Sequence, residues 1–175
     1  YDASSIDVLI VTHAHQDHIG RVPKLIQEGF KGVIYSTPAT KDLSVLMFDD
    51  AINVMAHDAQ KSNCQPIYDE RDVARTLQLW ETHEYHEKFE IGDVTVEFLD
   101  AGHILGSAMI RISRGGKNIV FTGDLGNSPE PLLNDTEAPA GADYLLMESV
   151  YGDRQHEERE SRVDVLRGAI EDARK

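Results

Sequence analysis

The sequence is poor in cysteine and contains no long apolar run. Cys64 is the only cysteine, which excludes an internal disulfide and a cysteine-rich metal site, and we interpret it as a small packing residue. No apolar segment approaches the ~20 residues that cross a bilayer, and Tyr1 to Asp7 lack the basic start and apolar core of a signal peptide. These absences favour a cytoplasmic protein without a membrane segment.

Basic residues are also scarce relative to acidic ones. The chain has 17 Lys and Arg against 31 Asp and Glu, which gives a net charge of −14. Such a surface repels a phosphate backbone, so this chain alone should bind nucleic acid poorly without specific contacts. A polyanionic substrate would therefore need bound metal ions or a basic surface supplied elsewhere.

The 175 residues suffice for one domain with an apolar core. Apolar runs predict strands at 6–12, 33–37, 94–99, 108–113, 119–122 and 144–147, all in the core. Apolar residues at helical spacing predict helices at 19–30, 42–60, 69–80 and 163–173. Mixed helices and strands with an antiparallel middle indicate an α/β or layered α+β domain without an internal boundary.

Four side chains that can bind metal lie directly after the first predicted strand. They belong to His13, His15, Asp17 and His18. A loop at the end of a strand can turn all four toward one cavity, where imidazoles bind zinc and a carboxylate adds negative charge. A solvated histidine-rich loop is the alternative, but the HxHxDH spacing favours a metal site.

Two more segments place single polar residues near the ends of strands. His103 lies between Gly102 and Gly106, and Asp124 follows the strand predicted at 119–122. Taken singly, His103 is more often a structural histidine and Asp124 a turn residue. Together with the first cluster, they offer what a pair of metals needs, another imidazole and a bridging carboxylate.

The segments HAHQDHIG, GHILGSA and FTGDLG, in this order, resemble the metallo-β-lactamase superfamily. Glu148 and the following SVYGDR narrow the resemblance to the β-CASP nucleases. Among the β-CASP nucleases, the sequence is similar to the RNA-processing branch. This branch includes the endonuclease subunit of the cleavage and polyadenylation specificity factor and its prokaryotic relatives. The resemblance implies an αββα fold, of which residues 1–175 would form an N-terminal portion that ends before the β-CASP insert.

The resemblance also implies a role for each candidate residue. One zinc would be held by His13, His15 and His103, a second by Asp17 and His18, and Asp124 would bridge them; manganese and iron are alternatives. A hydroxide held between the two metals would attack the phosphodiester, and Asp17 would orient or deprotonate it. Glu148 would hydrogen-bond a later histidine that protonates the leaving oxygen. Because that histidine and one zinc ligand lie beyond this chain in the family, we expect the chain alone to bind the second zinc weakly and to cleave RNA weakly or not at all.

The predicted function is metal-dependent hydrolysis of single-stranded RNA, by endonuclease activity, 5′-exonuclease activity or both. Partners in the full-length protein would be a second copy or an RNA-processing complex. Two alternatives remain: a small-molecule hydrolase, such as a thioesterase or lactamase, and a non-catalytic scaffold subunit.

Several other residues receive an ordinary structural interpretation. We interpret four histidines without ligand spacing as surface or structural residues: His57, His83, His86 and His156. Asp100 either orients a metal ligand or simply ends a strand. Trp80 and Tyr85 are expected in the core more than against a base.

Overall fold

The computed structural model describes residues 1–62, 65–153 and 159–174, so Cys64, Arg154 and His156 lie outside the described residues. A three-stranded parallel sheet has the order β1 (Val8–Ile10), β2 (Val33–Ser36) and β3 (Trp80–Thr82). A five-stranded sheet has the order β4 (Lys88–Ile91), β5 (Val94–Asp100), β6 (Ala108–Arg114), β7 (Lys117–Phe121) and β8 (Tyr144–Leu146). Its strands are antiparallel from β4 to β7, and β8 is parallel to β7. The mixed α/β class is confirmed.

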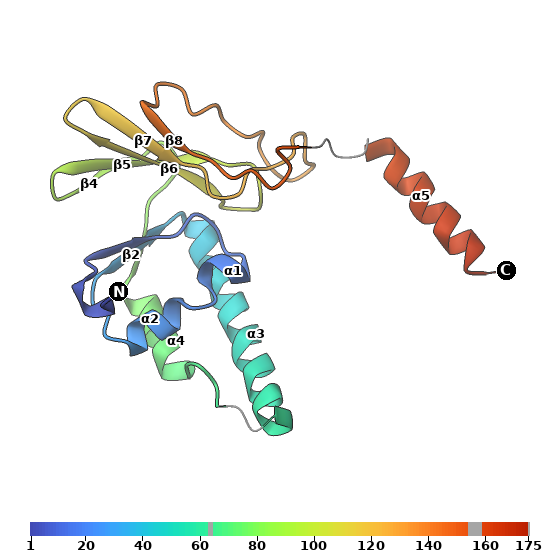
Figure 1. Ribbon diagram of the computed structural model, residues 1–175, viewed down its shortest axis with the longest axis horizontal. Coiled ribbons are helices and arrows are strands. Elements are labelled where there is room, and N and C mark those ends of the chain that lie inside the picture. The colour runs from blue at the N-terminus through green and yellow to red at the C-terminus, as the bar shows by residue number, and fades with distance from the viewer. Residues whose placement is uncertain (63–64, 154–158, 175) are drawn as a thin grey trace.

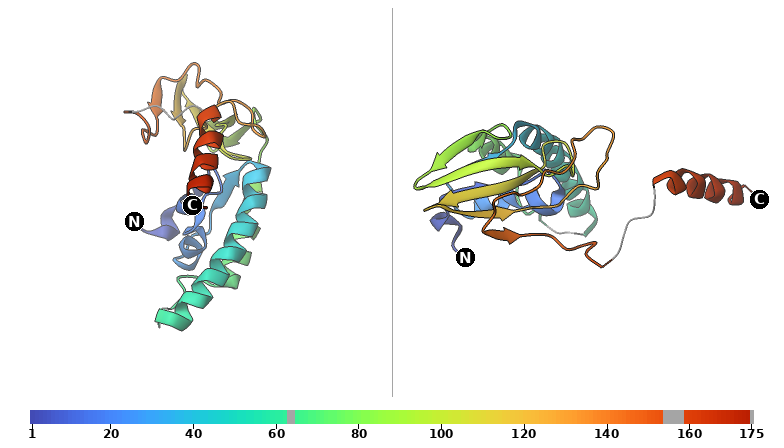
Figure 2. Two further views of the ribbon diagram at one scale, coloured as in Figure 1. Left: turned by 90° about the vertical axis from the view of Figure 1, so that its right-hand side faces the viewer. Right: turned by 90° about the horizontal axis from the view of Figure 1, so that it is seen from above.

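The helices lie on one side of the smaller sheet, and the larger sheet lies on the other (Figure 1). They are a 3-10 turn η1 (Ala3–Ser5), α1 (Gln16–Ile19), α2 (Val22–Gln27), α3 (Pro38–Ser62) and α4 (Glu70–Gln78). The last helix, α5 (Arg159–Asp172), lies apart from both sheets in Figure 1 and in the right-hand view of Figure 2. Among the described residues, no helix is long and apolar enough to span a bilayer.

Three apolar clusters hold the layers together. Helices pack on the smaller sheet through buried residues that include Phe30, Phe48 and Trp80. The two sheets meet at Val96 and Phe98, which pack with Ile10, Tyr35 and Ile110 from either sheet. The alternation along β5 sends Leu99 to the opposite face, where it packs with Met109, Val120 and, from the loop after β7, Leu125 and Ala142.

Some predicted boundaries were wrong. The helix predicted at 19–30 is two short helices, and Pro23, at the start of α2, is the residue that favours a new helix there. The helical apolar pattern was read at 42–60, and the helix spans Pro38–Ser62, so the expectation that Pro38 suits the first turn of this helix is confirmed. The strands β3 and β4 were not predicted, and Trp80 is buried in β3 rather than ending a helix.

The strand at 144–147 was predicted to lie in the core, and this prediction was wrong. Tyr144, Leu146 and Met147 are each more than half exposed. The strand pairs with β7 on one side, and no further strand follows it in the sheet among the described residues. The apolar pattern therefore predicted the strand correctly, but the prediction that its side chains are buried was wrong.

Candidate metal centre

The predicted ligands come together because each follows the carboxyl end of a strand. The segment that begins at His13 follows β1, His103 follows β5, and Asp124 follows β7. Thr12 joins the sheets here, since its carbonyl accepts a hydrogen bond from the backbone N–H of Ala108 in β6. The four polar groups of His13, His15, His103 and Asp124 lie within 4.8 Å of one another.

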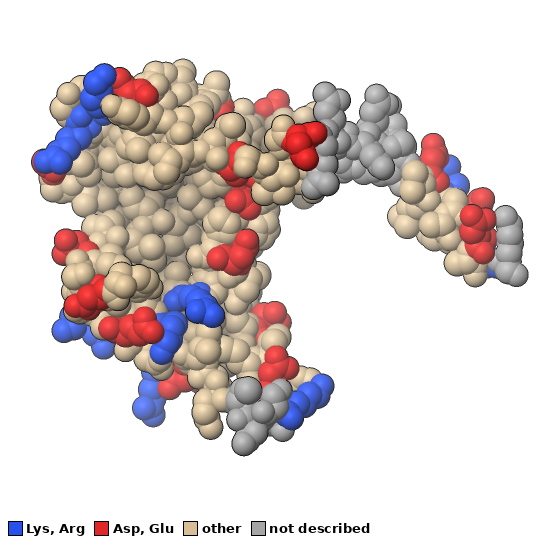
Figure 3. Space-filling model, viewed as in Figure 1, with Lys and Arg blue, Asp and Glu red and all other residues tan. Residues whose placement is uncertain are grey.

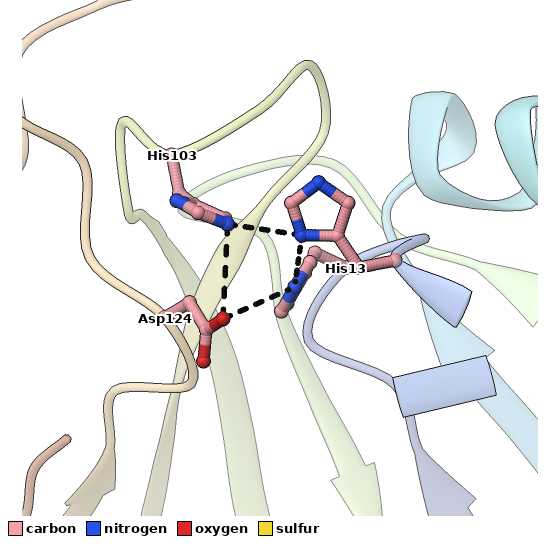
Figure 4. A group of neighbouring side chains, drawn as sticks. His13, His103 and Asp124 are labelled. Carbon is pink, nitrogen blue, oxygen red and sulfur yellow. Dashed lines mark hydrogen bonds and ion pairs between the residues drawn. The ribbon is translucent and has the colours of Figure 1, made fainter. Parts of the chain in front are cut away.

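Three imidazoles face one another in this group (Figure 4). His15 Nδ1 lies 3.0 Å from His13 Nε2 and 3.1 Å from His103 Nε2. Two nitrogen ligands of one tetrahedral zinc ion are ~3.3 Å apart, because each bond measures about 2.0–2.1 Å. Both distances are close to this value, so the three nitrogens are positioned to bind a single ion.

Asp124 presents its two oxygens to two different groups of side chains. One oxygen, Oδ2, lies 3.7 Å from His13 Nε2 and 3.8 Å from His103 Nε2. The other, Oδ1, lies 3.4 Å from His18 Nε2, which is itself 3.6 Å from Asp17 Oδ2. A carboxylate placed in this way can bind one ion with each oxygen, as a bridge between two metals does.

The two groups of side chains differ in exposure. The His13 side chain is fully buried, whereas those of His18 and Asp17 are 30% and 77% exposed. His18 and Asp17 lie on α1, a single helical turn that begins after His15. The centre thus has a buried histidine side and an open carboxylate side that faces solvent.

Burial favours the neutral form of His13 and His103. It lowers the pKa of His13 to about 4, and the neighbouring His18 lowers it further, while Asp124 opposes both. Burial and the nearby His15 also lower the pKa of His103. A neutral imidazole offers the lone pair that a metal needs, so the site is prepared for metal at physiological pH.

The loop that carries His103 is clamped by close backbone contacts. Gly102 and Gly106 adopt positive φ angles of 62° and 81°, and a Cβ on Gly106 would lie 2.5 Å from the backbone nitrogen of Thr40. The hydroxyls of Thr37 and Thr40 donate to the Gly106 carbonyl at 2.6 and 2.8 Å. The start of α3 therefore fixes the position of the His103 loop.

Further contacts fix the backbone on both sides of the His103 side chain. Ser107 Oγ accepts hydrogen bonds from the N–H groups of His103 and Ile104, and the Tyr85 hydroxyl donates to the Ser107 carbonyl. Asp100 accepts from the Gly102 N–H at 2.8 Å. Asp100 therefore holds the backbone one residue before His103, which is consistent with an orienting role for its carboxylate.

The Asp124 loop is tied to the His103 loop and to Glu148. The Gly126 N–H donates to the Ala101 carbonyl at 2.9 Å. A Glu148 carboxylate oxygen accepts from the Leu125 N–H, and the Glu148 N–H donates to the Thr122 hydroxyl. Glu148 thus contacts the residue next to Asp124, which brings it into the same site.

Sequence reasoning missed several residues that hold the ligands in place. Thr12 Oγ1 lies 3.1 Å from His13 Nδ1, and the Asn134 amide donates to Asp100. Hydroxyl and amide side chains have no spacing that marks them as partners of a distant loop, so no signal could have found them. The remaining described histidines have partners outside the cluster: His57 lies near Asp58, His83 near Glu87 and Phe89, and His86 near Glu137.

Comparison with known proteins identifies relatives over almost the whole chain. The family model of the metallo-beta-lactamase superfamily matches residues 1–169. Ribonuclease TTHA0252 from Thermus thermophilus is 38% identical over 89% of this chain and 34% of its own length. Transcription termination factor FttA from Pyrococcus horikoshii is 39% identical over 94% of this chain and 26% of its own.

A eukaryotic relative also matches most of this chain but only part of its own length. Endoribonuclease YSH1 from Kluyveromyces lactis is 32% identical over 93% of this chain and 22% of its own length. The chain therefore spans about a third or less of the curated relatives it matches. Two of these three relatives are ribonucleases by name.

Proposed function

The chain belongs to the metallo-β-lactamase superfamily, and we propose that it forms part of a metal-dependent hydrolase that cleaves phosphodiester bonds in RNA. Its relatives support the RNA-processing branch of the β-CASP ribonucleases. The observation that carries the proposal is the position of Asp124 between two groups of metal-binding side chains. Because the relatives are much longer than this chain, the activity is proposed for the whole protein, of which residues 1–175 form a partial domain before the β-CASP insert.

We propose two zinc ions for this centre, with manganese and iron as alternatives. One group consists of the buried His13 with the partly buried His15 and His103, the other consists of the more exposed Asp17 and His18, and Asp124 lies between them. Two divalent ions, when bound, lower the pKa of a water molecule and neutralise charge on the phosphate oxygens. This supply of positive charge is needed because the chain has a net charge of −14. On the face in view, basic and acidic side chains are interspersed, with no extended basic area in the described part of the chain (Figure 3).

The protein's own residues position the reacting groups. Thr12 Oγ1 lies 3.1 Å from His13 Nδ1, the ring nitrogen on the side away from the other ligands, and this contact orients Nε2 toward the metal position. Asp17, with a largely exposed carboxylate, faces the side open to substrate and is placed to orient the attacking water or accept its proton. Glu148 holds the Asp124 loop through Leu125, and we propose that its carboxylate also orients a histidine from the rest of the protein.

The two alternative functions have less support. A small-molecule hydrolase would share the metal centre, but two relatives named above are ribonucleases. A scaffold subunit would not need the side chains that bind metal, and all six lie together in this chain. The hydrolase proposal is therefore the one that uses the observed geometry.

Cleavage of labelled single-stranded RNA by the intact protein tests the proposal. We expect metal-dependent cleavage by the wild type and loss of cleavage in His13→Ala. The matched control is His57→Ala, because that side chain is 63% exposed and its ion-pair partner is Asp58 on the same helix. Equal cleavage by wild type and His13→Ala would overturn the two-metal mechanism.

A further inference from the structure

An apolar pocket of about 580 Å³ lies beside the metal centre and shares His15 and His103 with it. Helix α3 forms one wall, and the loop after β7 forms the opposite wall with Leu132 and Leu133. The pocket's volume lies within the range of roughly 300–1,000 Å³ that is typical of ligand sites. Because His15 and His103 belong to both, the pocket directly adjoins the metal centre.

The walls of this pocket are mostly aliphatic. Leu43, Leu46 and Met47 come from α3, and Ile104 and Leu105 come from the loop that carries His103. Apart from the two shared histidines, Glu130 is the one ionisable side chain among the described residues that line it. A phosphate group placed here would lose its hydration without gaining a cation from the described residues that line the pocket. The pocket therefore suits an uncharged group with apolar faces.

We propose that this pocket receives a nucleobase of the RNA strand, from a nucleotide adjoining the phosphodiester bond that is cleaved. The inference rests on the proposed function, because it takes the metal centre as the place of the phosphate. The sugar links each phosphate to a neighbouring base, and the base is the part of the nucleotide with uncharged, flat faces. Aliphatic side chains contact such faces as apolar residues do elsewhere in nucleic-acid complexes.

Exposure at the rim determines how selective the pocket is. Leu46 and Leu132 are 65% and 84% exposed, so the polar edge of a bound base stays in contact with water. Apolar walls discriminate weakly between ligands that differ by polar groups. We therefore expect all four bases to bind with similar affinity, and a base already paired and stacked in a duplex to be excluded.

Replacing single bases in an RNA substrate tests the pocket directly. A short single-stranded RNA with one mapped cleavage site is made abasic at one nucleotide at a time, and kcat/KM is measured with the intact protein. Stacking a base on protein side chains contributes enough that its loss lowers kcat/KM by about fivefold to a hundredfold, and we expect a value near the lower end. One nucleotide next to the cleaved bond should show this loss, whereas exchanging its base should change kcat/KM by less than about threefold.

A protein variant links this effect to the pocket. Leu46→Ala should raise KM for intact RNA about threefold to tenfold by removing apolar contact area, with little change in kcat. It should also reduce the difference between intact and abasic RNA. Val54→Ala is the matched control, because Val54 lies on the same helix, is 51% exposed and does not line the pocket.

A binding measurement separates failure of this inference from failure of the proposed function. Uncleavable oligonucleotides that carry 2-aminopurine at one nucleotide at a time locate the bound base without cleavage. At one position the fluorescence should increase when the protein binds, and this increase should be smaller with Leu46→Ala. If this response appears in a protein that cleaves no RNA, the base pocket stands and the hydrolase proposal fails. The base pocket is overturned if no abasic position matters and the fluorescence is unchanged. It is also overturned if Leu46→Ala lowers the melting temperature and leaves the ratio of intact to abasic cleavage as in wild type, because another segment of the protein then covers the pocket.

Discussion

The loops around the metal centre and the β8–α5 region differ in how far their side chains are buried and bonded. Around the centre, Thr37, Thr40 and Ser107 are buried and hydrogen-bonded. On β8 and α5, apolar side chains such as Leu146 and Leu166 are more than half exposed. The positions of the metal ligands are therefore fixed by contacts within residues 1–148, and the apolar face of α5 contributes nothing to them. Four perturbations test this difference.

The largest effect is expected from Asp124→Asn, which removes the charge of the bridging carboxylate. Loss of several kcal/mol of charge stabilisation corresponds to a decrease in kcat/KM of about a thousandfold. The measurement is RNA cleavage by the intact protein, with Asp58→Asn as control, because that carboxylate is 67% exposed and lies away from the centre. Similar cleavage rates for the two variants would show that Asp124 does not act in the metal centre.

A glycine exchange tests the close contact between the two ligand loops. A Cβ on Gly126 would lie 1.8 Å from the Gly102 carbonyl oxygen, so Gly126→Ala must push the Asp124 and His103 loops apart. We expect the free energy of unfolding to fall by about 3 kcal/mol. In α5, a Cβ on Gly168 would meet nothing within 4 Å, so Gly168→Ala should be neutral or stabilise by up to about 1 kcal/mol. Urea denaturation measures both, and equal effects would contradict the difference between the regions.

The pH dependence of stability tests the buried state of His13. Its pKa is about 4 in the folded chain and 6.5 in its ordinary state, so the unfolded chain binds more protons between these values. The free energy of unfolding of the metal-free protein should therefore fall as pH decreases from 6.5 to 4, by roughly 3 kcal/mol at most. His13→Asn should reduce this slope, and His57→Asn should retain it. A wild-type stability that stays constant over this window would show that His13 is not buried in neutral form.

The smallest effect is expected in α5. Leu166 is 61% exposed, so Leu166→Ser should change the free energy of unfolding by less than about 0.5 kcal/mol. Ile34→Val, at a fully buried position of β2, should cost about 1 kcal/mol despite the smaller chemical change. A larger loss from Leu166→Ser, measured by urea denaturation, would mean that the α5 face is covered in solution.

The sequence predicted the elements with regular patterns better than the short ones. The strands predicted at 94–99 and 108–113 match β5 and β6 to within a residue, and the two faces of these strands pack on different clusters. The strand β4 shows the same alternation in Lys88, Phe89 and Glu90, and that signal was overlooked. Burial of β8 could not be predicted, because an apolar strand has the same pattern whether or not another layer covers it.

The candidate site was predicted residue by residue, but its supports were not. Six side chains that can bind metal were assigned from their motifs and from the family resemblance, and they lie together. Which Asp124 oxygen faces which group, and the hold of Thr37 and Thr40 on Gly106, depend on contacts between segments far apart in the chain. Such contacts depend on tertiary packing, which a local pattern does not encode.

Metal content tests the central claim most directly. After incubation with zinc and removal of excess, the chain should retain about one tightly bound ion in the buried histidine group, and a second, weaker ion should appear on titration. His13→Ala should retain none, whereas His57→Ala should match the wild type. Equal zinc content in His13→Ala and wild type would contradict the assignment of these residues to a metal centre.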